Sequence, residues 1–422
     1  MKTITYLYLQ LETEKDLSQE IEESLDSIFS GKIYKHNNND DKHFFELLKH
    51  ALEIKNHYAV NALIDRLNDN LNLEKIDLKL FLYQESIFNV SCFPRKLENN
   101  VTQLQIFVSQ HFFNNLNEDE QLGIIGHEIA HFLFDHLRFP AYDIINTPFN
   151  IGDTGELKSN LIYHSKMSEI TADIIGLVAN EFNYKAYSTA LIKHTTGLSD
   201  SANSIFSITP LIEIVLQQFD KHAENIFFND LYSTHPLMPV RVKIINTIAK
   251  SRLVRFFGQE VSDKDFQLYK KEYNKIVDDI VKTVYPEIYP DETVINEVLI
   301  PMSVAVMLAD NKIDKNEYSL IKSMIKKTHR DFKEITESFI QKHKDLAFNE
   351  IKNNLIHISI RLAKKESFNK SLIIPIIRKL IIVAASDGRI EKSELLCIYQ
   401  FAKEFDVSKQ DIVLLMKTQY KV

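Results

Sequence analysis

The sequence predicts a mainly α-helical protein that contains one small β-sheet and ends in an all-α domain. The 422 residues include only 9 glycines and 10 prolines, and long amphipathic runs rich in leucine, isoleucine, lysine and glutamate fill most of the chain. Three short runs rich in β-branched and aromatic residues interrupt these helices. A helix-turn-helix pattern then occurs twice near the end. A chain of this length can form two or three domains, each with its own core.

The composition excludes several broad classes of protein. A net charge of -8 argues against nonspecific binding to nucleic acid. The cysteines, Cys92 and Cys397, are too few and too far apart to form a disulfide framework, and they are typical of a reducing compartment. No stretch reaches the roughly 18 uncharged apolar residues that a membrane-spanning helix needs. We therefore expect a cytoplasmic protein without a membrane span.

The first third of the chain predicts helices followed by a small sheet. Residues 12–75 are rich in charge and divided at Gly31, so residues 1–75 are assigned to an N-terminal helical region. Three strands are expected next, at residues 78–83, 88–93 and 104–108. An extended peptide could add to an edge of such a sheet through main-chain hydrogen bonds.

A well-delimited helix follows these strands. Asn117 and Glu120 have the spacing of an N-cap with a capping box, and acidic residues fill the first turn. Pro140 marks the stop, so the helix is expected to span about residues 118–138.

This helix carries the sequence His127-Glu128-Ile129-Ala130-His131, which has the form H-E-x-x-H. Histidines one turn apart share a helix face, so both rings can reach a single Zn²⁺ ion. Glu128 lies off that line and can take a proton from a metal-bound water, whose pKa zinc lowers to about 7. The pattern indicates a zinc hydrolase. The alternative is a buried helix whose histidines only satisfy local hydrogen bonds.

Catalytic zinc requires a third protein ligand and an open position for water. The metzincin class is excluded because Phe134 and Leu137 stand where its glycine and third histidine would be. A second helix is expected to open at Ser168, with Glu169 and Asp173 on one face. Glu169 is then the candidate third ligand, while Asp173 would accept the second N–H of a ligating histidine and fix its tautomer. An exposed acidic pair in a helix's first turn is the alternative.

Three ordered segments resemble the gluzincin family of HtpX, Oma and the CAAX prenyl proteases. They are Gly126–His131, Glu169–Asp173, and Ser233–Pro236 with Arg241. Upstream, Asn89–Pro94 is similar to the family's Asn-Ala strand, with Val90 in place of the usual alanine, and residues 105–116 are similar to the strand and turn before the zinc helix. The resemblance covers about residues 76–250. It implies an α+β zincin-type fold.

The resemblance also implies an endopeptidase that acts on peptides or unfolded proteins. One Zn²⁺ per chain would be held by His127, His131 and Glu169, with Glu128 as general base and Asp173 supporting a ligand. The substrate would pair with the edge strand around Asn89, Val90 and Ser91.

Pro236 biases His235 away from helix geometry, so His235 should lie on a loop. It would either plug the open metal position or stabilise the oxyanion. A histidine that only caps a turn is the alternative. Arg241 is expected to anchor this turn to the fold rather than to touch substrate.

The helix-turn-helix pattern repeats between residues 308–317 and 385–394, each time as Asp, a small turn residue, a basic residue, Ile and an acid. An EF-hand is excluded because Lys312 and Ile321 occupy calcium-ligand positions. The pair resembles the TerB-like domain of tellurite-resistance proteins over about residues 291–422. Its acids could line a binding face for a protein partner, although ordinary caps and turns explain them more simply.

The predicted organisation is an N-terminal helical region, a peptidase domain, a helical linker and a TerB-like all-helical domain. Their ranges are 1–75, 76–255, 256–290 and 291–422. One interpretation is a soluble cytoplasmic zinc endopeptidase whose TerB-like domain regulates it or recruits substrate. The other is a noncatalytic interaction or stress-response adaptor with a vestigial zinc site. The intact ligands and base favour the enzyme.

Overall fold

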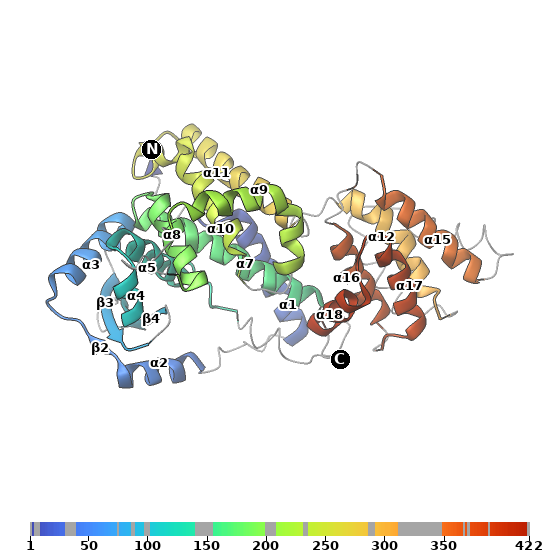
Figure 1. The fold of residues 1–422 in the computed structure, drawn as a ribbon, viewed down its shortest axis with the longest axis horizontal. Helices are drawn as coiled ribbons and strands as arrows, with labels where there is room; N and C mark the ends of the chain where they lie inside the picture. The colour runs from blue at the N-terminus through green and yellow to red at the C-terminus, as the bar shows by residue number, and fades with distance from the viewer. Residues whose placement is uncertain are drawn as a thin grey trace. The chain divides into compact units, whose positions relative to one another are not determined.

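The computed structural model describes most of the chain, and it is mainly helical with one small mixed sheet, as predicted (Figure 1). The described residues are 2–3, 9–29, 39–73, 76–85, 89–96, 102–139, 155–198, 208–230, 235–285, 292–310, 348–365, 368, 372–386 and 389–419. The predicted features that lie outside them include the break at Gly31, the stop at Pro140, the Ser233-Thr234 part of the third motif, residues 311–317 of the first repeat and the Asp387-Gly388 turn of the second.

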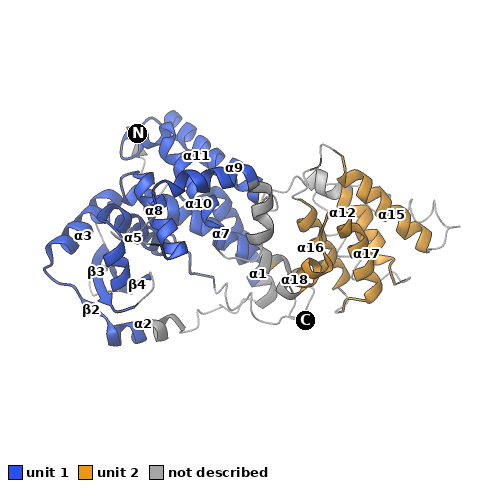
Figure 2. Ribbon diagram, viewed as in Figure 1, with its two compact units in different colours: residues 1–141, 160–284 blue, residues 142–159, 285–422 orange. Residues whose placement is uncertain are grey.

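The chain divides into two compact units (Figure 2). Unit 1 comprises residues 1–141 and 160–284, and unit 2 comprises residues 142–159 and 285–422. The predicted N-terminal region therefore falls in the same unit as the H-E-x-x-H helix. Among the described residues, no helix is both long enough and apolar enough to cross a membrane.

A four-stranded sheet in unit 1 has the order β2-β3-β5-β4. Its strands are β2 (Leu52–Glu53), β3 (Ile76–Tyr83), β4 (Val90–Lys96) and β5 (Thr102–Ser109). The predicted strands are confirmed as β3, β4 and β5, whereas the short β2 was not predicted. β3 and β5 pair in parallel, and β4 pairs antiparallel to β5, which makes β4 an edge of this sheet. Stacked Phe81 and Phe107 lie in its aromatic core.

The N-terminal residues add helices to this unit. They form α1 (Glu12–Phe29), α2 (Asn39–His50) and α3 (Tyr58–Leu71), while β1 (Lys2–Thr3) pairs with β6 (Glu260–Val261). Helix α1 buries an apolar stripe that includes Leu17 and Ile21, as the 3.6-residue period requires. Its buried side chains also include Glu14, an acidic residue that is only 1% exposed.

Helix α5 (Glu118–Leu133) carries the H-E-x-x-H sequence and follows the short α4 (Gln110–Asn115). The predicted capping box is present, because the Asn117 side chain accepts from the Glu120 N–H at 3.0 Å and Glu120 Oε2 accepts from the Asn117 N–H at 2.9 Å. The predicted end near residue 138 was wrong. Asp135 takes a left-handed φ of 53°, and the His136 N–H donates to the His131 carbonyl at 3.0 Å, which closes the helix.

Helix α7 (Gly155–Ala179) begins well before Ser168, so the predicted start there was also wrong. Glu169 and Asp173 lie in the middle of the helix, and both are buried. The alternative of an exposed acidic pair in a first turn is therefore excluded. The unit continues with α8 (Tyr184–Thr196), α9 (Leu211–Asp230), α10 (Met238–Lys250), η2 (Arg252–Phe256) and α11 (Asp263–Val284).

Glycines let α5 and α7 approach closely. A Cβ atom on Gly126 would lie 2.3 Å from the Ala179 Cβ and 3.3 Å from the Gly176 Cα. A Cβ on Gly176 would lie 2.5 Å from the Gly123 carbonyl oxygen. Neither glycine can carry a side chain unless backbone moves, and this close crossing brings the two motif-bearing helices together.

Unit 2 is all-helical in its described part, as predicted. Its helices are α12 (Glu292–Met307), α15 (Phe348–Ala363), α16 (Ile373–Ala384), α17 (Lys392–Lys403) and α18 (Lys409–Gln419). In the second repeat, Glu391 and Glu394 form a capping box at the start of α17. Glu391 and Glu394 therefore act as local helix caps, which was the simpler of the two explanations given for such acids.

Replacing Gly126 with Ala should lower the free energy of unfolding by about 1–3 kcal/mol, because the added methyl group overpacks the α5–α7 crossing. In an open helix interior the same change would instead stabilise by about 0.5–1 kcal/mol. Urea denaturation of the wild-type and Gly126→Ala proteins measures the sign of this change in the free energy of unfolding. A more stable Gly126→Ala protein would contradict the close crossing.

Candidate metal centre

A pocket of about 360 Å³ in unit 1 is lined by most of the predicted site residues, but not by Asn89, Ser91 or Asp173. Its walls come from β4, α5, α7, α8 and the start of α10. The residues that line it include Val90, Cys92, Pro94, His127, Glu128, His131, Glu169, His194, His235 and Arg241.

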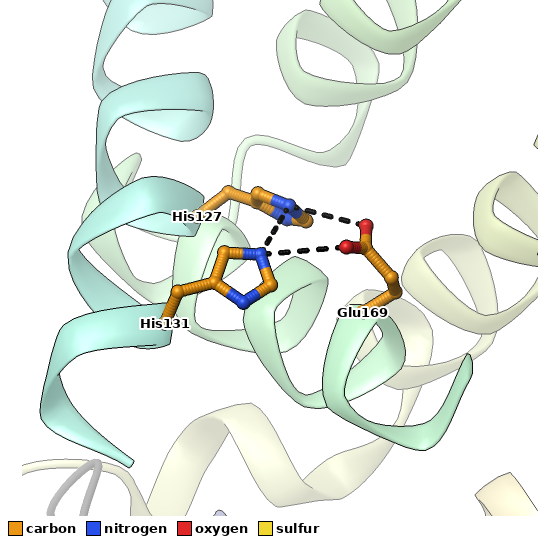
Figure 3. A group of neighbouring side chains, drawn as sticks. All are labelled: His127, His131 and Glu169. Atoms are coloured by element: carbon orange, nitrogen blue, oxygen red, sulfur yellow. Dashed lines mark hydrogen bonds and ion pairs between the residues drawn. The ribbon is translucent and has the colours of Figure 1, made fainter. Parts of the chain in front are cut away.

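The three predicted metal ligands converge on one point of this pocket (Figure 3). His127 and His131 lie one turn apart on α5, and their Nε2 atoms are 3.2 Å apart. Glu169 reaches them from α7, with Oε2 at 3.4 Å from His127 Nε2 and Oε1 at 3.5 Å from His131 Nε2. The set is buried except for His131, which is partly exposed.

These separations suit a tetrahedral cation. Two donor atoms at 2.0–2.1 Å from a zinc ion and at the tetrahedral angle lie about 3.4 Å apart. Two imidazole nitrogens with one carboxylate oxygen are also the donor set of one class of catalytic zinc site. His127, His131 and Glu169 therefore could hold a metal ion, and they fit zinc.

Asp173 fixes the orientation of His127. One helical turn after Glu169, its Oδ1 lies 3.0 Å from His127 Nδ1, which turns Nε2 toward the ligand cluster. The same carboxylate accepts from the Tyr187 hydroxyl at 2.8 Å and from Arg241 Nε at 2.7 Å and Nη2 at 2.6 Å. These hydrogen bonds and the positive charge of Arg241 compensate the cost of burying the Asp173 carboxylate.

The comparisons with known proteins agree with this geometry. Residues 59–249 match the family model of peptidase family M48. This part of the chain is similar to the M48 peptidases. Residues 296–417 match the model of tellurite resistance protein TerB, as the repeat predicted. No curated protein and no solved structure matches the chain. The M48 match supports a metallopeptidase that acts on peptides or proteins.

The contacts of Arg241 are compatible with the expected role of anchoring the turn that contains His235. Its guanidinium binds Asp173 on α7, and Nη2 lies 3.8 Å from Glu169 Oε2. Since α10 follows the turn directly, Arg241 ties this segment to α7.

Charged partners hold the ligands in defined ionisation states. Burial alone would favour the neutral acid, but His127, His131 and Arg241 hold the pKa of Glu169 well below its usual value. Burial lowers the pKa of His131 to about 3. Burial also disfavours charge on His127, yet its hydrogen bonds to Asp173 and Glu169 raise its pKa to about 9. Without metal, His127 is therefore the protonated ligand at neutral pH.

Glu128 lines the same pocket beside the ligands. Burial raises its pKa to about 7, so the carboxylate can exchange a proton near neutral pH. Across from it, burial raises the pKa of the Cys92 thiol, which makes Cys92 an unreactive part of the wall.

Among the residues that the structure describes, strand β4 pairs only with β5, so its other edge has no described partner strand. The Ser109 N–H donates to the Asn89 carbonyl at 3.0 Å, so alternate residues from Asn89 onward bond to β5. The main-chain groups of Val90 and Cys92 therefore point away from β5. Ser91, in contrast, lies opposite Phe107 in the register, and its main-chain groups point toward β5.

Two further imidazoles border the pocket. His235 Nε2 lies 3.3 Å from Glu169 Oε1, and the side chain is 64% exposed. It is not a member of the ligand cluster formed by the other three residues. His194 on α8 also lines the pocket and was not predicted from the sequence.

Sequence reasoning also missed three residues that support the ligands: Tyr187, His136 and Glu14. His136 Nδ1 lies 2.9 Å from His131 Nδ1, and its Nε2 lies 3.3 Å from Glu14 Oε1. A histidine five residues after the motif was a weak signal for His136. Nothing in the local sequence of Glu14 or Tyr187 marks them, because their partners are distant in the chain.

Zinc binding should become tighter as the pH rises from 7 to 9. A ligating imidazole needs a free lone pair, so zinc must displace the proton that His127 holds below its pKa of about 9. The apparent affinity should gain about tenfold per pH unit in this window and level off above it. Competition titration with a chelator of known pH dependence measures this slope, and an unchanged affinity between pH 7 and 9 would contradict it.

Proposed function

We propose that the chain is a zinc-dependent endopeptidase of the gluzincin type, with one Zn²⁺ held by His127, His131 and Glu169. The observation that carries the proposal is the convergence of these three donors within 4.8 Å of one another, in a pocket that also holds Glu128. A structural zinc site is closed by four protein ligands, whereas three ligands leave one position for substrate or water.

The residues of the pocket have distinct roles in peptide hydrolysis. When bound, zinc supplies a Lewis acid that polarises the scissile carbonyl and lowers the pKa of water. Glu128 acts as general base and then returns the proton to the leaving amine. In the metal-free site, burial raises the pKa of Glu128 to about 7, which makes its carboxylate a stronger base than an exposed glutamate. Asp173 holds His127, and Arg241 with Tyr187 holds Asp173.

The substrate enters as an extended strand along β4. Val90 and Cys92 offer main-chain donors and acceptors on the edge away from β5, and their side chains form the wall beneath. Pro94 lacks an N–H, so it can only accept a bond at that end of the edge. Recognition by main-chain pairing favours unfolded or extended protein segments.

His235 stabilises the oxyanion rather than plugging the metal position. Its Nε2 approaches Glu169 but lies outside the cluster of the three ligand atoms. Its 64% exposure places the ring where the pocket meets solvent, in reach of a bound substrate carbonyl.

The remaining assignments follow from this function. The M48 domain does the chemistry, and the TerB-like domain recruits substrate or a regulatory protein partner. The range 256–290 connects the two in the proposed organisation. A reducing, cytoplasmic setting fits the two free cysteines.

A Glu128→Gln protein should keep its zinc and lose about 10³-fold in cleavage of unfolded casein, because an amide cannot act as a base. Metal analysis and peptide release are measured on the same preparations. Glu118→Gln is the matched control, since it makes the same change on the same helix at an exposed position that pairs with Arg66. Wild-type cleavage by Glu128→Gln would contradict the role of Glu128. A wild-type protein with neither zinc nor cleavage would favour the noncatalytic adaptor.

Replacing His235 with Ala should lower kcat by about 100-fold with unchanged zinc content, as loss of an oxyanion donor does. The exposed His57, which makes no side-chain cap bond at α3, provides the control His57→Ala. Steady-state cleavage of a fluorogenic peptide gives kcat and KM for both. A higher basal rate for His235→Ala would contradict the oxyanion role and indicate a plug.

A further inference from the structure

A further buried carboxylate, Glu14, lies near the candidate metal centre and belongs to no motif of the sequence. Glu14 lies on α1, well before the matched residues 59–249, and its side chain is 1% exposed. Burying an ionised carboxylate is costly unless it is paired and hydrogen-bonded. Its partners therefore indicate what holds it in the interior.

The contacts of Glu14 lead directly to a metal ligand. Its Oε1 lies 3.3 Å from His136 Nε2, and the other nitrogen of this ring, Nδ1, lies 2.9 Å from His131 Nδ1. His131 has its remaining nitrogen, Nε2, toward Glu169 and His127. One uninterrupted line of polar groups thus joins α1 to the ligand cluster.

The hydrogens along this line can be assigned in only one direction if His131 binds a cation. Binding through Nε2 requires a lone pair there, which leaves the hydrogen of the neutral ring on Nδ1. That N–H must donate to His136 Nδ1, so His136 carries its own hydrogen on Nε2. This second N–H makes no hydrogen bond in the structure, but its nitrogen lies 3.3 Å from Glu14 Oε1, within ion-pair distance of a carboxylate that can only accept.

Other hydrogen-bond donors stabilise the ionised carboxylate of Glu14. Gln10 Nε2 donates to Oε1 at 2.7 Å, and the Thr171 hydroxyl donates to Oε2 at 2.5 Å. Burial opposes ionisation, but His136, Gln10 and Thr171 together lower the pKa of Glu14. Thr171 lies on α7 between Glu169 and Asp173, so Glu14 also contacts the helix that provides the third ligand.

We propose that Glu14 and His136 are positioning residues that hold His131 in the tautomer and orientation needed to bind the metal. The inference rests on the proposed zinc site. Each histidine ligand then has its own carboxylate: Asp173 orients His127 directly, and Glu14 orients His131 through His136. Helix α1 is accordingly part of the metal centre of this chain, although the family match begins after it.

The test is a double-mutant cycle on zinc affinity. Loss of a residue that orients a metal ligand typically costs 10–100-fold in affinity. Glu14→Gln and His136→Phe should each weaken zinc binding by at least about tenfold. The double variant should bind no more weakly than His136→Phe alone, because Glu14 acts only through His136. Glu12→Gln is the matched control on the first turn of α1, where Glu12 pairs with Lys270 at the surface, and its affinity should equal that of the wild type.

Two results would overturn the inference while leaving the zinc site intact. One is wild-type affinity for Glu14→Gln; the other is a double variant whose loss is the product of the two single losses, which would show independent effects. A wild-type protein that binds no zinc would overturn the proposed function as well.

A second measurement needs no variant and covers the case in which Glu14→Gln fails to fold. Nitrogen-15 NMR of histidine side chains in the wild-type protein should show His131 protonated on Nδ1 and His136 protonated on Nε2. The opposite tautomer on either ring would overturn the assignment.

Discussion

The close crossing of α5 and α7 is the constraint on which the metal centre depends. His127 and His131 come from one helix and Glu169 from the other, so their donor atoms can meet only if the helix backbones nearly touch. Gly126 and Gly176 permit this approach, since a Cβ atom at either position would overlap the opposite helix. The side chain of Tyr187 fills the remaining space beside Gly123 and reaches Asp173 with its hydroxyl group. Packing and ligand geometry are therefore set by the same few contacts.

The crossing buries several charges, and elements from the whole unit compensate them. Helix α7 provides Glu169 and Asp173, α10 provides Arg241, and α1 provides Glu14. Removing one partner of such a buried pair leaves an uncompensated charge, which typically costs about 3–5 kcal/mol. The site is thus coupled to the fold of unit 1, including the N-terminal helices that precede the family match. The edge of β4 and the exposed His235 are parts of the pocket that can meet a substrate.

Features that depend on neighbouring residues were predictable from the sequence, and features that depend on distant partners were not. The capping box at Asn117, the three main strands and the shared face of His127 and His131 all follow from local spacing. The end of α5 depends on a left-handed Asp135, a conformation that the residue type permits but does not require. The start of α7 was predicted from the apolar run after Ser168, but the helix already extends from Gly155. Glu14 contributes to the centre only through tertiary packing, so no pattern around it could have predicted its role.

X-ray anomalous diffraction at the zinc edge, on crystals of the purified full chain, tests the central claim most directly. The account predicts one strong peak per chain, bonded to His127 Nε2, His131 Nε2 and a carboxylate oxygen of Glu169. Absence of a peak in zinc-equilibrated crystals, or a zinc ion held by other residues, would contradict it.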